Sequence, residues 1–191
     1  MTSVLVEKGL DKGAIWHLGD PYGEQKKLIS GEAWVDLSHK SVISIGGVDR
    51  LSWLHAITTQ DFENIKENEW VSGLILDALG HINHQFIAMD DEEITWLVIE
   101  SVKKDELIAY LEKMKFMLLV EIKDASSEYA LVRLPGAPDE IGGPFHLIKR
   151  SELELFRSEL NSKYQEVGIW ALEAERVAAG RARLLFEVDH K

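Results

Sequence analysis

The sequence of 191 residues contains no cysteine. Without cysteine, these residues cannot form a disulfide, present a thiolate nucleophile, or ligate zinc or an iron–sulfur cluster through sulfur. The lack of disulfides is compatible with a cytoplasmic location, which is the location we expect.

Long apolar runs and excess positive charge are lacking too. No stretch approaches the roughly 18 apolar residues of a membrane span. The first residues, MTSVLVEKGLDKG, have neither the basic flank nor the apolar core of a signal peptide. We therefore expect no membrane partner. The 21 Lys and Arg residues are outnumbered by 33 Asp and Glu, which gives a formal net charge of −12. That field repels a polyanion and disfavours direct nucleic-acid binding.

Several motifs that would assign a chemistry are also missing. The sequence has no G-x-G-x-x-G, no P-loop and no G-x-S-x-G. Its seven histidines contain no H-x-x-x-H pair, and His81 and His84 would point to opposite faces of a strand. We therefore predict no metal site, because chelation needs several ligands that converge on one point.

The elements that the sequence does specify are short strands grouped between helices. Runs rich in Val, Ile, Leu and Trp predict strands over 33–37, 41–45, 70–78, 81–89, 94–99, 118–123 and 128–134. Helical spacing of apolar residues predicts helices over 48–60, 102–114, 151–164 and 168–179. Short connections such as 89–93 exclude parallel crossovers, so the sheets should be largely antiparallel and the fold class α+β.

The strand at 81–89 carries the most informative polar residue. Alternation places His84 on one face with Ile82, Phe86 and Ala88. The imidazole is then either a core histidine that hydrogen-bonds a backbone carbonyl or a pocket-lining group whose pKa the cavity adjusts. His84 is accordingly a weak catalytic candidate.

Two carboxylates are further candidates. Glu100 follows the strand at 94–99 and could pair with a donor-rich ligand edge such as an aminopyrimidine, or lie in solvent beside the next helix. Glu187 shares a face with Asp189 on a predicted final strand. That pair is either suited to acid–base chemistry or a charged guard on an edge strand.

Four segments, taken in order, carry a resemblance to a known family. They are Asp36-Leu37-Ser38-His39, GGVDRLSWLHAITTQDF, LILDALGHINHQFIAMDDEEITWLVIE and ALEAERVAAGRARLLFEVDHK. Their order and spacing resemble the folate-binding relatives of the glycine-cleavage T-protein, an aminomethyltransferase superfamily, and most closely its YgfZ-type members, including actinobacterial ones. The likeness runs from about residue 20 to the end.

This resemblance implies a fold and a domain organisation. The expected T-protein folate-binding fold has two interleaved lobes of largely antiparallel sheet with helices packed on them. Lobe one would comprise about residues 1–41 and 124–191, and lobe two about 42–123. The stretch 35–62 would be scaffold beneath a folate-sized channel. The family's C-terminal barrel domain and its K-G-C-Y-x-G-Q-E motif are not found, so we expect the chain to be truncated before them.

The resemblance also implies tetrahydrofolate or a derivative as the cofactor. Phe86 and Trp96 would form walls for the pterin, and Glu100 would accept from its ring N–H groups. Arg176 would bind the anionic glutamate tail. The complete predicted folate-binding set is His84, Phe86, Trp96, Glu100, Arg176 and Glu187.

Four positions depart from the family pattern. Where the T-protein carries the first, essential Asp of an Asp pair, this sequence holds His84, followed by Gln85. The family's Asn near the pterin corresponds to Glu100, and the acid of its R-x-E-A-G segment corresponds to Ala178. Loss of the first carboxylate disfavours aminomethyl transfer, since a neutral imidazole does not stabilise a developing iminium cation.

These inferences lead to one favoured function and two alternatives. The favoured function is a YgfZ-like, tetrahydrofolate-binding protein that supports iron–sulfur protein assembly or repair, with iron–sulfur proteins as partners and tRNA modification as an associated process. The alternatives are a folate-dependent aminomethyltransferase and a non-enzymatic protein-interaction scaffold.

Overall fold

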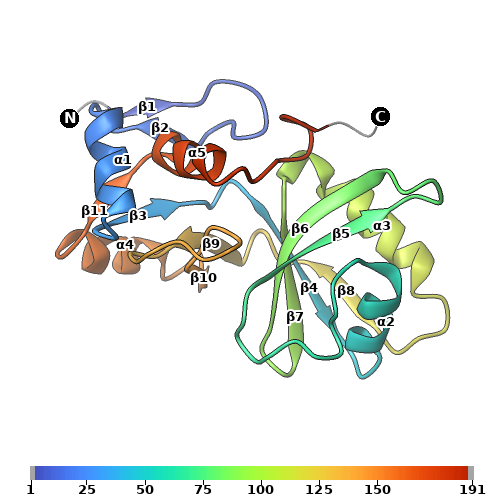
Figure 1. Cartoon of the computed structure of the whole chain (residues 1–191). Helices are drawn as coiled ribbons and strands as arrows, with labels where there is room; N and C mark the ends of the chain where they lie inside the picture. The colour runs from blue at the N-terminus through green and yellow to red at the C-terminus, as the bar shows by residue number, and fades with distance from the viewer. Residues whose placement is uncertain (1–2, 189–191) are drawn as a thin grey trace. The chain divides into compact units, whose positions relative to one another are not determined.

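The computed structural model describes residues 3–188, and these form two compact units (Figure 1). Unit 1 takes in the chain up to Lys40 together with Ser127–Arg181. Unit 2 takes in Ser41–Ser126 and the described residues from Ala182 onward. Both units combine antiparallel strand pairs with helices, so the predicted α+β class is confirmed.

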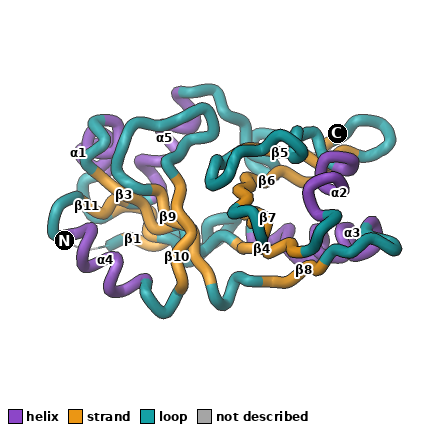
Figure 2. Tube along the Cα trace, turned by 90° about the horizontal axis from the view of Figure 1, so that it is seen from below, coloured by secondary structure: helices purple, strands orange, loops and turns teal. Residues whose placement is uncertain are grey.

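Unit 1 is built on a four-stranded sheet in which the strands β3 and β11 pair in parallel and the other pairs are antiparallel. In spatial order the strands are β10 (Phe145–Lys149), β9 (Tyr129–Arg133), β3 (Ala33–Asp36) and β11 (Gln165–Val167). Figure 2 shows α1 (Pro21–Ile29) and α5 (Ile169–Ala178) on one side of this sheet and α4 (Leu153–Asn161) on the other. A separate hairpin consists of β1 (Val4–Leu5) and β2 (Ile15–His17).

Unit 2 is a five-stranded antiparallel sheet with two helices packed against it. In spatial order the strands are β5 (Val71–Leu76), β6 (Ile82–Asp90), β7 (Ile94–Ile99), β4 (Ser41–Gly46) and β8 (Glu121–Asp124). The helices are α2 (Arg50–Ile57) and α3 (Lys104–Met114), the latter preceded by a 3₁₀ turn, η1 (Ser101–Lys103). Buried apolar side chains from the sheet and from both helices form one core cluster.

The GGVDR motif has a structural role in unit 2. Asp49 does not cap α2 with its side chain; its Oδ2 instead accepts a hydrogen bond of 2.8 Å from the backbone N–H of Leu119. Arg50 turns toward the end of β6, where its Nε and Nη2 donate to the two oxygens of Asp90 at 3.0 and 2.9 Å. Both side chains of this ion pair are buried. The motif therefore joins α2 to the sheet and to the loop that precedes β8.

The predicted final strand is wrong. After Leu184 the chain forms a turn, with Leu185 in the left-handed region at φ +68°. The carbonyl oxygen of Arg183 accepts from the N–H groups of both Phe186 and Glu187 at 3.1 Å. Because the backbone bonds to itself in this turn, strand alternation does not apply to Glu187, and Asp189 lies outside the described residues. These residues group with unit 2, although the sequence assigned them to lobe one.

Two searches of the described residues were negative. Within 3–188, no helix is both long and apolar enough to cross a membrane. In the same range, no group of three or more His, Asp or Glu side chains is placed to hold a metal ion.

Candidate functional site

Strand β6 presents the predicted pair His84 and Phe86 to the interior of unit 2. Both side chains are 2% exposed, as the alternation of the strand predicted. The ring of Phe86 stacks on that of Phe62, with centroids 6.5 Å apart, inside the core cluster. Phe86 therefore packs the core and has no free face for a ligand in this conformation.

His84 is buried without the partner that a core histidine usually has. Its Nδ1 has no hydrogen-bond partner among the described residues, and its ring donates to no backbone carbonyl there. Its Nε2 faces the carboxylate of Glu106 across 4.0 Å, and its ring lies 5.9 Å from that of Tyr110. Burial lowers the pKa of His84, although the Glu106 carboxylate opposes this shift. The imidazole is consequently neutral at pH 7 and can accept or donate a hydrogen bond, but it supplies no negative charge.

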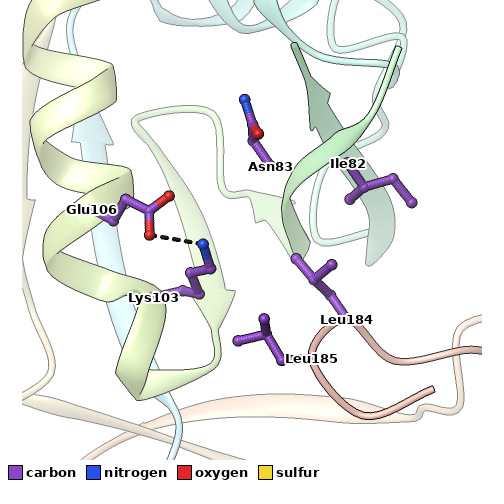
Figure 3. Close-up of a pocket in the computed structure, with 6 residues that line it drawn as sticks. All are labelled: Ile82, Asn83, Lys103, Glu106, Leu184 and Leu185. Carbon is purple, nitrogen blue, oxygen red and sulfur yellow. Dashed lines mark hydrogen bonds and ion pairs between the residues drawn. The ribbon is translucent and has the colours of Figure 1, made fainter. Parts of the chain in front are cut away.

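A pocket of about 250 Å³ lies in unit 2 beside this region (Figure 3). Its wall comes from the start of β6, from the helical segment that begins at η1, and from residues 182–188, which we call the C-terminal turn. The lining residues are Ile82, Asn83, Lys103, Glu106, Leu184 and Leu185. Lys103 Nζ and Glu106 Oε2 form an ion pair of 2.7 Å at its side, and the ammonium lowers the pKa of the Glu106 carboxyl. Drug-sized ligands usually occupy about 300–1,000 Å³. The pocket lies below that range, so it can enclose only part of a drug-sized ligand.

Glu100 lies directly after β7 and holds the C-terminal turn. Its two oxygens accept from Arg183 Nε at 2.8 Å and from Nη2 at 3.0 Å, a fork-shaped ion pair. Glu187 contacts the same arginine through the backbone, because its Oε2 accepts from the Arg183 N–H at 3.1 Å. The structure thus brings Glu100 and Glu187 together through Arg183.

The two remaining candidates lie elsewhere. Trp96, on β7, donates from Nε1 to Asp91 Oδ2 at 2.8 Å and points away from the core that its neighbour Leu97 joins. Arg176 belongs to unit 1, on α5, where its Nε and Nη2 donate to Glu173 Oε2 at 3.1 and 2.8 Å. The structure therefore places Arg176 in unit 1 and the other five predicted residues in unit 2.

Four residues at this site were missed by sequence reasoning as site residues. The side chain of Gln85 hydrogen-bonds the backbone on both sides of Arg183, nearly a hundred residues away in the sequence. No local sequence pattern indicates such a long-range pairing. Lys103 and Glu106 did carry a signal, since oppositely charged residues three apart on a helix meet on its surface.

Comparison with known proteins gives a fold and a partial sequence likeness. No family model matches the chain. A curated aminomethyltransferase of Thermosipho melanesiensis is 26% identical over 102 residues, which are 53% of this chain and 28% of that protein. The crystal structure of the glycine cleavage system aminomethyltransferase T from Bartonella henselae matches with a TM-score of 0.80 at 14% identity. That match covers 95% of this chain and 60% of the other.

These matches establish that the chain has the aminomethyltransferase fold, which confirms the predicted fold. The match covers less than two thirds of the length of each protein: 28% of the curated relative and 60% of the solved one.

Proposed function

We propose that this chain binds tetrahydrofolate or a derivative and does not transfer an aminomethyl group. The observation that carries the proposal is the fold, shared over 95% of the chain with an enzyme named for aminomethyl transfer. The partial sequence match to a second aminomethyltransferase supports it. The pocket of about 250 Å³ in unit 2 is the place where we propose that the pterin ring binds.

The absence of transfer activity follows from the chemistry at His84. Aminomethyl transfer develops positive charge at the migrating carbon, and a preorganised carboxylate is the group that stabilises such charge. The position that the resemblance aligns with the essential Asp holds instead a buried imidazole with a lowered pKa. A neutral ring gives no comparable electrostatic stabilisation.

The physiological role that we propose is support of iron–sulfur protein assembly or repair in the cytoplasm, with iron–sulfur proteins as partners. It rests on the YgfZ-type resemblance of the sequence segments.

Calorimetric titration with 5-formyl-tetrahydrofolate tests the binding. We expect saturable heat with the wild-type chain, and weaker binding in Arg176→Ala if that guanidinium serves the glutamate tail. The control is Lys149→Ala, which removes one positive charge from an exposed site in the same unit. No heat at millimolar folate would reject folate binding. A melting temperature that folates leave unchanged would then favour the interaction-scaffold alternative, because a ligand at 100 times its Kd stabilises a protein by about 2.7 kcal/mol.

A transfer assay separates binding from catalysis. Formation of methylene-tetrahydrofolate from an aminomethylated carrier protein should be absent in the wild type. The variant His84→Asp restores a carboxylate and tests whether the charge alone was missing. Turnover by the wild-type chain that is lost in His84→Ala would reject our assignment and establish the aminomethyltransferase alternative.

A further inference from the structure

The C-terminal turn, residues 182–188, is attached to the rest of unit 2 by the side-chain amide of Gln85 and by the ion pair between Arg183 and Glu100. Gln85 Nε2 donates to the carbonyl oxygen of Ala182 at 3.1 Å, and Gln85 Oε1 accepts from the N–H of Leu184 at 2.7 Å. These two bonds bracket Arg183 and fix the backbone on either side of it. A side chain on β6 therefore determines where the guanidinium points.

The guanidinium of Arg183 donates to both carboxylate oxygens of Glu100. Its Nε and Nη2 donate in parallel to the two carboxylate oxygens at 2.8 and 3.0 Å. The two side chains are only 9% and 13% exposed, so solvent screens the pair weakly. The guanidinium also lies over the ring of Phe186, 5.5 Å from its centroid. Fork-shaped pairs of this kind are among the stronger hydrogen-bonded contacts in proteins.

A guanidinium and an aminopyrimidinone present the same face to a carboxylate. Each displays two parallel N–H donors on one N–C–N fragment, at the spacing of the two carboxylate oxygens. The 2-amino-4-oxo edge of a reduced pterin has this arrangement. One carboxylate cannot accept both forks at once, so Arg183 and such a heterocycle exclude each other at Glu100.

The residues that line the pocket are close in sequence to this ion pair, although neither Glu100 nor Arg183 is among them. Leu184 and Leu185, which follow Arg183 directly, line one side of it. Lys103, three residues after Glu100, lines the other. A heterocycle seated on Glu100 would thus meet apolar side chains of the same turn that carries its competitor. Leu185 is held at φ +68°, a backbone conformation that is strained for a leucine, and release of the turn would relieve that strain.

We propose that Arg183 is a built-in competitor for the aminopyrimidinone edge of the ligand at Glu100, and that Gln85 keeps it in place. The proposal rests on the proposed function, since it concerns regulation of the same folate site. The apparent Kd of the wild type is then the intrinsic Kd divided by the fraction of molecules in which Arg183 has released Glu100. Any partner that draws the turn away from unit 2 raises the affinity for the folate.

The test is a calorimetric titration of the full chain with 5-formyl-tetrahydrofolate in three variants. Arg183→Ala should bind at least fivefold more tightly than the wild type, because the guanidinium that competes for the carboxylate of Glu100 is then removed. Gln85→Ala should shift the affinity in the same direction by a smaller factor. Glu100→Gln should weaken binding at least tenfold, with or without Arg183.

The control is Arg181→Ala, which removes an arginine two residues away whose partner is Glu175 in unit 1. Its affinity should equal that of the wild type. Gln85→Ala also covers the case in which Arg183→Ala fails to fold because the half-buried carboxylate of Glu100 has lost this ion pair. If folded Arg183→Ala or Gln85→Ala binds as tightly as the wild type or more weakly, competition is refuted while folate binding stands. If neither the wild type nor any variant saturates, folate binding itself is refuted, and the competitor with it.

Discussion

Removal of Arg50 should destabilise unit 2 more than any surface change, because it leaves a buried carboxylate without its cation. Asp90 accepts two hydrogen bonds from Arg50, one from the hydroxyl of Thr95 and one of 2.9 Å from the N–H of Glu92. The side chains of Arg50 and Asp90 are 11% and 6% exposed. Breaking one partner of a buried ion pair costs about 3–5 kcal/mol. Since two of the four hydrogen bonds to Asp90 remain, we expect Arg50→Met to cost about 3 kcal/mol.

A double-mutant cycle measures this coupling. Urea unfolding, followed by both tryptophan fluorescence and far-UV circular dichroism, would be compared for Arg50→Met, Asp90→Asn and the double variant. The loss of unfolding free energy in the double variant should be smaller than the sum of the two single losses by about 1.5 kcal/mol or more, because the double variant contains no buried unpaired charge. The control is Lys66→Met, which breaks an exposed pair with Glu69 and should cost less than about 1 kcal/mol.

The reasoning would be refuted by a loss below about 1 kcal/mol in Arg50→Met, or by strictly additive effects. Either result would mean that Asp90 is not held by Arg50 in solution. The GGVDR motif would then not join α2 to the sheet through this ion pair.

Two further predictions concern glycine and histidine positions in unit 2. Gly47→Ala should cost more than about 2 kcal/mol of unfolding free energy, because a Cβ there would lie 2.0 Å from the carbonyl oxygen of Leu119 and φ is +107°. Gly80→Ala, also at positive φ but facing open space, should cost only about 1 kcal/mol, and equal losses in urea unfolding would contradict this explanation. Burial lowers the pKa of His84, so as the pH falls the histidine is protonated in the unfolded chain before it is protonated in the folded one. The free energy of unfolding should therefore decrease as the pH is lowered from 6.5, by at most about 1.4 kcal/mol per pH unit. His84→Gln should flatten that dependence of urea midpoints between pH 7 and 5, leaving the share of His146, whose pKa burial also lowers; an unchanged slope would show that His84 titrates normally.

Helix α1 shows why some elements escaped sequence reasoning. Its Asp20-Pro21 start is a good N-terminal signal, and Asp20 Oδ1 does accept from the N–H of Gly23 at 3.0 Å. The apolar stripe is interrupted, however, because the buried face includes Glu24. That carboxylate accepts from Leu18 N and Gly168 N at 2.7 and 2.9 Å. The second partner lies 144 residues away, so the sequence near Glu24 gives no reason to bury an acid.

In the candidate site, too, local sequence pattern predicted part of the arrangement and distant partners decided the rest. Alternation over β6 was enough to put His84 and Phe86 on the buried face, because side-chain direction in a strand depends only on the residue's place in it. It did not show that one ring would pack the core and the other would keep an unpaired nitrogen. Those outcomes depend on Phe62, Glu106 and Tyr110, which come from other elements.

The sequence by itself determined the α+β class, the antiparallel hairpins of unit 2 and the end of α5 shortly before Gly180, all of which follow from contacts within a few residues. Tertiary structure alone decided that Glu100 would form an ion pair with Arg183, 83 residues away, and that Gln85 would hydrogen-bond the C-terminal turn that carries Arg183. The physical reason is that a buried charge or amide must find its partner wherever folding brings one, and chain separation places no limit on that partner.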